Sequence, residues 1–188
     1  GGMREAVNSV GFGLNGICYS DDLGLWVAVG DSDGSKAVIL TSPNGTRWTQ
    51  QTPTVPKSIG LSAVAAGNGK VVAVGAPETL GDTYILTSSD GTTWTERANP
   101  KNIILTSVCY DSTIGLWAAI GGYDGANAYL ITSSDGINWT ERENPNTFSS
   151  LEYGQITSTG GLFVAVGLSS SFAPSALRST DGTNSEHL

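Results

Sequence analysis

Several residue types on which catalysis and metal binding depend are scarce in this chain of 188 residues. It contains one histidine and two cysteines, and charged residues make up only 14%. We expect the histidine, His187, to be a solvated residue near the C-terminus. The sequence has no Cys-x-x-Cys, no His-Glu-x-x-His and no phosphate-binding glycine loop before a helix. These absences argue against nucleophile–histidine catalysis, and we predict no cofactor.

Basic residues and long apolar runs are also lacking. Lysine and arginine together number 9 against 17 acidic residues, which gives a formal net charge of −8. Nucleic acids and anionic membranes bind basic faces, so neither is an expected partner. No apolar run approaches the ~18–20 residues of a membrane helix, and we predict no membrane insertion. The cellular compartment stays open.

The two cysteines, Cys18 and Cys109, occupy equivalent positions in two of the internal repeats described below. In a four-fold ring such positions face each other across the centre, beyond the ~4.4–6.8 Å between Cα atoms that a disulfide needs. We interpret both as small buried apolar residues. A disulfide or a metal-binding pair remains the alternative.

Glycine is abundant, with 25 residues, and 39% of the chain is apolar, which is typical of a turn-rich all-β protein.

A short motif recurs through the chain. TSSDGTTWTER at residues 87–97 returns as TSSDGINWTER at 132–142, with a variant, TSPNGTRWT, at 41–49 and a decayed copy, RSTDGTN, at 178–184. The tryptophans Trp48, Trp94 and Trp139 are separated by 46 and 45 residues, and Ser185 stands 46 residues further on. A period of ~40–50 residues with several short strands is typical of a propeller blade.

Each repeat contains four segments with strand character. In the third repeat these are 103–110, 116–121, 128–132 and 139–142, separated by glycine, serine and aspartate turns. The sequence therefore predicts an all-β fold, a four-bladed β-propeller of four ~45-residue repeats with four antiparallel strands each. We expect one domain, 1–188, with blades at about 3–47, 48–93, 94–138 and 139–185.

Repeats one and three share Cys-Tyr and Gly-Leu-Trp, which repeats two and four lack, as a duplicated two-blade unit would give. We favour a closed monomeric ring, and an edge-to-edge dimer of eight blades is the alternative. The decayed last motif predicts a frayed end at 184–188.

The recurring motif resembles the Asp-box of the BNR-repeat propellers, whose usual form is Ser-x-Asp-x-Gly-x-Thr-Trp. The copies here are one residue shorter between Asp and Gly. The resemblance implies a hairpin between the third and fourth strands at the blade periphery, with a structural role. Recurrence in every blade favours the same interpretation, since a fold device is needed four times and an active site once. The residues given this structural role are Asn44, Trp48, Asp90, Trp94, Asp135, Trp139 and Asp181.

A binding site is expected on the face formed by the loops between second and third strands and by the crossovers between blades. The loops are 31–36, 76–82, 122–127 and 168–174. The candidate binding residues are Asp31, Asp33, Tyr123, Asp124 and Asn127. Asp31-x-Asp33-Gly34 resembles the start of a calcium loop, but the later ligands are missing, so calcium is a weak alternative to a polar turn. An exposed hairpin tip is the alternative for the Tyr123 group.

We predict a non-catalytic binding or structural module that recognises glycan or protein through this loop face. The best-known enzymes with Asp-boxes are sialidases, which need an arginine cluster, a tyrosine nucleophile and a pair of acids. Arg97 and Arg142 follow glutamates at equivalent positions, and we expect them to form salt bridges at the blade edge. A sialidase-like glycoside hydrolase is the first alternative. The second is a fragment of a larger propeller protein, such as an adhesion or phage-tail-type protein.

Overall fold

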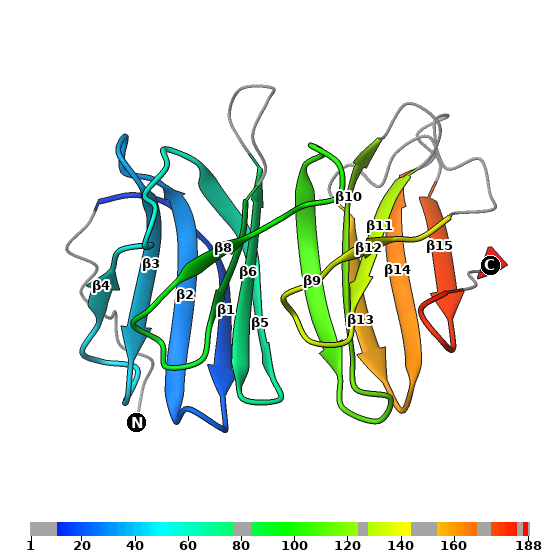
Figure 1. The fold of residues 1–188 in the computed structure, drawn as a ribbon, viewed down its shortest axis with the longest axis horizontal. Helices are drawn as coiled ribbons and strands as arrows, with labels where there is room; N and C mark the ends of the chain where they lie inside the picture. The colour runs from blue at the N-terminus through cyan, green and yellow to red at the C-terminus, as the bar shows by residue number, and fades with distance from the viewer. Residues whose placement is uncertain are drawn as a thin grey trace.

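The fold consists of four antiparallel sheets of four strands each, placed side by side (Figure 1). The computed structural model describes residues 11–76, 84–123, 128–143, 154–168, 174–183 and 186–187. Blade 1 comprises β1 (Leu14–Ser20), β2 (Leu25–Ser32), β3 (Ala37–Ser42) and β4 (Thr49–Gln51). Blade 2 comprises β5 (Gly60–Gly67), β6 (Lys70–Ala76), β7 (Tyr84–Ser88) and β8 (Thr95–Arg97). Blade 3 comprises β9 (Leu105–Asp111), β10 (Leu116–Tyr123), β11 (Ala128–Ser133) and β12 (Thr140–Glu141). Blade 4 comprises β13 (Gln155–Thr159), β14 (Leu162–Leu168), β15 (Pro174–Ser179) and β16 (Glu186–His187).

The central strands of each blade are apolar on both faces because each inner sheet lies between two others. In β2 and β6, consecutive residues such as Val27, Ala28 and Val29 are all buried. Their side chains alternate between the two faces of the sheet. Both faces of β6 pack on neighbouring blades, whereas in β2 Val27 and Val29 pack on blade 2 and Ala28 packs within its own blade, against Val38 and Leu40. The β3, β7 and β11 strands have the same character. This explains why the repeats contain continuous apolar runs rather than an alternating pattern.

The fourth strand of each sheet is the last strand of its blade, so the blade bounds are taken from the pairing of the strands. β4 pairs with β3, for example through Thr41 and Thr49, so the segment after Trp48 belongs to the blade that precedes it. By this measure the sheets span 14–51, 60–97, 105–141 and 155–187. The last of them includes β16, whose residues Glu186 and His187 pair with β15. The frayed end expected at 184–188 is therefore wrong for these two residues, because the fourth strand forms even without the tryptophan of the motif.

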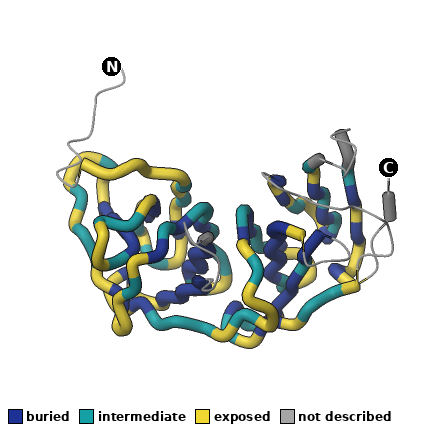
Figure 2. The backbone as a smooth tube through the Cα atoms, turned by 90° about the horizontal axis from the view of Figure 1, so that it is seen from above, coloured by how far each residue is buried: buried dark blue, intermediate teal, exposed yellow. Residues whose placement is uncertain are grey.

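The four blades form an open arc and not the closed ring that we favoured from the sequence. The innermost strands meet in succession, β1 against β5, β5 against β9 and β9 against β13. Blades 1 and 4 lie at opposite ends of the row in Figure 1, and the tube in Figure 2 is open between them. Each blade turns too little relative to its neighbour for four of them to complete a circle. Two blade faces, one at each end of the arc, therefore lack a neighbour within the described part of the chain.

Three apolar cores fill the spaces between consecutive blades. Cys18 packs against the core between blades 1 and 2, and Cys109 against the core between blades 3 and 4. Both are unpaired, because blade 2 separates them, and a disulfide is not formed. Burial raises the pKa of each thiol to about 12, which keeps both protonated at neutral pH.

Two kinds of blade interface alternate along the arc. From an odd blade to the next even blade, an aspartate accepts a hydrogen bond from a turn glycine. The N–H of Gly69 donates to Asp22 over 2.7 Å, and the N–H of Gly161 donates to Asp111 over 3.0 Å. From blade 2 to blade 3 the ring of Tyr110 lies against Gly67, where an added Cβ atom would come within 2.1 Å of Cδ1 of the tyrosine.

Among the described segments, none forms a helix with the length and apolarity that a membrane span requires.

Candidate functional site

The arc has two ends of different chemistry along the strand direction. The loops between second and third strands and the blade crossovers lie at one end, at the top of Figure 1, and we call this end the loop face. The turns between first and second strands and between third and fourth strands lie at the other, which we call the turn end. The candidate binding residues belong to the loop face, and the recurring motif belongs to the turn end.

The loop of blade 1 is held in shape by Asp33. Its Oδ1 accepts hydrogen bonds from the hydroxyl of Ser35 at 2.7 Å and from the N–H groups of Ser35 and Lys36, each at 2.9 Å. These bonds, the Ser35 hydroxyl first, lower the pKa of Asp33 to about 2. The carboxylate is thus ionised at neutral pH, and only its Oδ2 is directed elsewhere, 3.5 Å from Nε2 of Gln50.

Asp31 connects this loop to the neighbouring blade. Nδ2 of Asn15 donates to Oδ1 of Asp31 at 2.9 Å and to the carbonyl of Leu61 in blade 2 at 3.0 Å. One residue further on, the hydroxyl groups of Ser32 and Ser58 lie 2.9 Å apart, joining the loop to the crossover between blades 1 and 2. Asp31 itself is exposed.

Tyr123 ends β10 in blade 3, and 47% of it is exposed. The other two members of its expected group, Asp124 and Asn127, lie outside the described residues. Asp31 and Asp33 belong to blade 1, so blade 2 stands between them and Tyr123. The candidates therefore share the loop face but do not converge on one pocket. Within the described part of the chain, no group of three or more His, Cys, Asp or Glu side chains could hold a metal ion.

The blade crossovers on the loop face are fixed by contacts that sequence reasoning missed. The hydroxyl of Tyr84 donates to the carbonyl of Val55 at 2.5 Å, and burial, together with the nearby Glu96, raises the pKa of this tyrosine to about 12. In the next blade Tyr129 occupies the equivalent position. Its hydroxyl donates to Oδ1 of Asn99 at 2.6 Å and accepts from the N–H of Lys101 at 2.9 Å.

A repeated ion pair reinforces each of these crossovers. Lys57 pairs with Glu96 at 2.6 Å, and Lys101 pairs with Glu141. Each lysine lies in a crossover and each glutamate on the short fourth strand of the following blade. The spacing of the two lysines and of the two glutamates, close to the repeat length in both cases, is the sequence signal that could have revealed the pairs.

The arginines beside these glutamates do not form the salt bridges that we expected. Nε of Arg97 donates to the hydroxyl of Thr87 at 2.8 Å, and Nε of Arg142 donates to that of Thr132 at 2.7 Å. The glutamate and the arginine are neighbours on one strand, so their side chains leave opposite faces of it. Each arginine therefore bonds within its own blade, on the outer strands.

The recurring turns are organised by side-chain oxygens that accept backbone N–H groups. In blade 2, Oδ1 of Asp90 accepts from Thr92 at 2.8 Å and Thr93 at 2.7 Å, and Oγ of Ser88 accepts from Gly91 at 2.8 Å. The Nε1 of Trp94 donates to the carbonyl of Gly91 at 3.1 Å. Hydrogen bonds from these N–H groups hold the pKa of Asp90 well below its usual range.

The other three turns repeat this arrangement in part. The same types of contact are made by Asp135 and Trp139 in blade 3, by Asn44 and Trp48 in blade 1, and by Asp181, without a tryptophan, in blade 4. All seven residues thus lie at the turn end, away from the loop face. Their assignment to stability rather than to binding stays a prediction.

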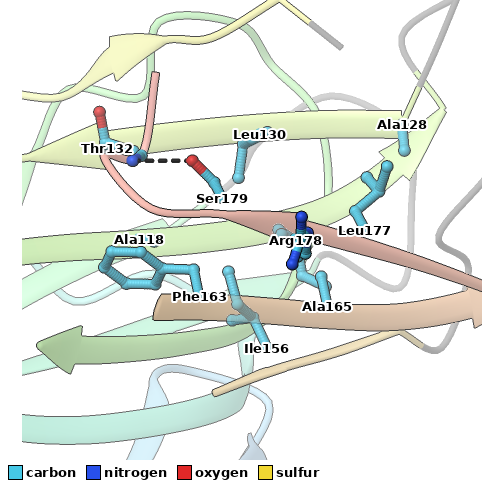
Figure 3. Close-up of a pocket in the computed structure, with 12 residues that line it drawn as sticks. Ala118, Ala128, Leu130, Thr132, Ile156, Phe163, Ala165, Leu177, Arg178 and Ser179 are labelled. Atoms are coloured by element: carbon cyan, nitrogen blue, oxygen red, sulfur yellow. Dashed lines mark hydrogen bonds between the residues drawn. The ribbon is translucent and has the colours of Figure 1, made fainter. Parts of the chain in front are cut away.

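A small apolar cavity of about 30 Å³ lies between blades 3 and 4 (Figure 3). Ala118 and Phe163 contribute to its walls, together with Ala165 and Leu177, and Ser179 accepts a hydrogen bond from the N–H of Gly182 beside it. Valines stand at the positions equivalent to Ala118 in blades 1 and 2, namely Val27 and Val72. We interpret the cavity as a packing gap that follows from this smaller side chain.

Comparison with solved structures gives several that share the fold at low sequence identity. YCF48 from Cyanidioschyzon merolae superposes with a TM-score of 0.66 at 15% identity, over 98% of this chain and 58% of that chain. A structure of YCF48 bound to D1 peptide gives 0.65 at 15% identity, over 94% and 55%. A Trypanosoma rangeli sialidase gives 0.59 at 13% identity, over 98% and 38%.

The present chain therefore spans little more than half the length of YCF48 and less than half that of the sialidase. Comparison with curated protein sequences gives no significant match. A family of β-propeller domains, DUF6242, matches residues 22–157, which is more than half of the sequence. The chain belongs to the DUF6242 beta propeller domain family.

Proposed function

We propose that the chain is a non-catalytic module that binds an extended peptide through the loop face. The observation that carries the proposal is the rigidity of this face. Both described crossovers are locked to their blades by a buried tyrosine and a Lys–Glu pair. A preorganised surface loses little conformational entropy on binding, which favours recognition without a large pocket.

The side chains presented there suit a peptide that carries a basic residue. Asp33 stays ionised at neutral pH, and the exposed Asp31 adds a second carboxylate on the same loop. The net charge of −8 attracts a cationic segment over a longer range. Tyr123, on blade 3, offers an aromatic surface at a distance that only an extended ligand spans.

Two comparisons of fold bear on the choice of ligand. YCF48, which shares the fold, has been captured with a peptide, whereas the other protein that shares it is a sialidase, an enzyme. The described arginines of this chain are spread over four blades, at Arg47, Arg97, Arg142 and Arg178, which does not favour the arginine cluster that a sialidase needs. A peptide ligand is therefore the better-supported proposal.

The proposal is tested with a panel of fluorescent basic, acidic and neutral peptides, read by polarisation. We expect binding of basic peptides, weakened about tenfold by the pair Asp31→Asn and Asp33→Asn and further by Tyr123→Ala. Asparagine keeps the turn acceptor, as Asn44 does in the recurring motif. The matched control is Asp21→Asn at the turn end, which removes one carboxylate as each single variant, Asp31→Asn or Asp33→Asn, does, and it should leave affinity unchanged.

Three results would contradict the proposal. They are an equal loss in the Asp21 control, binding of glycans on an array with no peptide bound, and turnover of a fluorogenic sialoside. The second would replace the peptide by a glycan, and the third would replace binding by catalysis.

A further inference from the structure

Blade 1 presents an apolar sheet surface at one end of the arc that is exposed along its inner strands, whereas Ala28, Val38 and Leu40 further out on the same face are buried with Trp48. The exposed surface is formed by Phe12, Leu14, Ile17, Tyr19 and Trp26, and we call it the leading face of blade 1. Ile17 is 59% exposed, Leu14 44% and Trp26 38%. Contiguous apolar side chains of this size are uncommon on a solvated surface and mark an interaction site.

Blade 3 carries the same surface in a buried state. The strand registers make Tyr19 and Trp26 equivalent to Tyr110 and Trp117, and the ring centroids lie 5.0 Å apart in the first pair and 4.7 Å in the second. Trp117 is completely buried, as is Leu105, the counterpart of Leu14. The two faces are built alike, and only one of them has a neighbour.

The neighbour that covers the face of blade 3 is the trailing face of blade 2. It consists of small and branched apolar residues, Ala63 and Ala65 on β5, Val72 and Val74 on β6, and Ile85 on β7. Gly67, at the end of β5, leaves the space that the ring of Tyr110 fills. A cover for the leading face of blade 1 must therefore be apolar, flat and without a side chain opposite Tyr19.

The trailing face of blade 4, at the other end of the arc, does not meet these requirements. Gln155 and Thr157 stand where blade 2 has Ala63 and Ala65, and Thr159 stands in the place of Gly67. All three are exposed polar residues. In the blade 2–blade 3 geometry, Thr159 of a second copy would collide with Tyr19, so a second copy of this chain is a poor cover.

We propose that the leading face of blade 1 is the binding surface for a further propeller blade with the chemistry of blade 2. The partner blade has alanine or valine on its two inner strands and a glycine at the end of the first. This interface is separate from the loop face and does not depend on the peptide-binding proposal.

The first test places such a blade in front of blade 1. A copy of residues 57–104 is joined directly to Leu14, so that the copied crossover enters β1 as the original enters β9. The carbonyl of Ile104 then replaces that of Gly13, and these two carbonyls already make equivalent hydrogen bonds, to Gly122 and Asp31. Ile17→Cys serves as the reporter, and its labelling is compared with the background from Cys18 and Cys109, two half-buried thiols whose raised pKa keeps them protonated.

We expect the labelling rate at position 17 to fall at least tenfold in the fusion, compared with the unfused chain. The matched control is the same fusion with Ala63→Gln, Ala65→Thr and Gly67→Thr in the copied blade, which reproduces the polar face of blade 4. It should label at the unfused rate. Equal rates in the two fusions would overturn the proposal, and so would an unfused chain of twice the expected mass that already protects position 17.

A second test uses the full chain and stands even if the fusion does not fold. Gln155→Ala, Thr157→Ala and Thr159→Gly give blade 4 the trailing face of blade 2. The proposal expects this variant to self-associate with rising concentration, measured by light scattering, while the unmodified chain and the variant with Ile17→Lys stay monomeric. A variant that remains monomeric, or association that survives Ile17→Lys, would contradict it.

Discussion

Blades 1 and 3 have nearly the same inner strands and opposite surroundings. Both carry a Tyr–Trp pair in the same register, with a cysteine next to the tyrosine. In blade 3 the pair is pressed against blade 2, whereas in blade 1 it faces solvent. Burial in a repeat protein is thus decided by the next repeat, because each blade contacts only its neighbours.

The comparison implies that one substitution has very different costs in the two blades. Trp117→Ala should lower the free energy of unfolding by about 3–5 kcal/mol, since a completely buried ring leaves a cavity. Trp26→Ala should cost less, about 1–2 kcal/mol, because 38% of Trp26 is already exposed to solvent. Urea unfolding followed by circular dichroism measures both. Equal losses would mean that the leading face of blade 1 is covered in solution.

The contact between Gly67 and Tyr110 gives the next largest effect. Gly67→Ala forces a methyl group into the tyrosine ring and should cost about 1–3 kcal/mol. Thr159→Ala, at the equivalent position of blade 4, should change stability by less than about 0.5 kcal/mol, because its side chain is exposed. If Tyr110→Ala does not relieve the cost of Gly67→Ala in the double variant, the steric explanation fails.

The turns of blades 1 and 2 form a natural pair for testing the role of the recurring motif. Asp90→Ala removes an acceptor of two N–H groups and should cost about 1 kcal/mol at pH 7, whereas Asp90→Asn, which copies Asn44, should cost less. The pKa of Asp90 is lower in the folded state than in the unfolded state, so its contribution is complete above pH ~4 and is lost as the pH falls further.

Unfolding curves between pH 7 and pH 2 should therefore show a shallower acid loss for Asp90→Asn than for the unmodified chain. Asp135 has the same depressed pKa and offers a repeat of the experiment in blade 3. A variant with the same acid dependence as the parent would show that the carboxylate is not held by the turn.

The smallest effect comes from the cavity between blades 3 and 4. Ala118→Val should raise the free energy of unfolding by about 0.5–1 kcal/mol, because a valine already occupies the equivalent position in blades 1 and 2 and buries two more methyl groups. The control is Val72→Ala, which should lose a similar or larger amount. A destabilised Ala118→Val variant would indicate that the gap is narrower than a valine.

The local order of this protein follows from its sequence. The spacing of the tryptophans predicted four repeats, and the apolar runs and turn residues placed the strands within a few residues of their observed bounds. Such features arise from contacts between residues close in the chain, where side-chain period and turn chemistry decide the structure. Acceptors such as Ser88 and Asp90 belong to the same class, since they bond residues two or three positions away.

Most of the features that sequence reasoning missed depend on contacts between residues that are distant in the chain. The Lys57–Glu96 pair and the Tyr84–Val55 bond join residues that are about 30 to 40 positions apart, and the glutamate was assigned to the wrong partner. The opening of the ring was missed for the same reason, since the angle between blades depends on how side chains such as Tyr110 fill the space beside Gly67.

The sequence by itself thus determined the blade, including its strands, its turns and its repetition. Only the tertiary structure decided how the blades lie against one another, which residues lock the loop face and which apolar face is left without a neighbour. The physical reason is that a blade forms from local hydrogen bonding and alternation, whereas the packing of one blade on the next depends on the shapes of two surfaces that are distant in the chain.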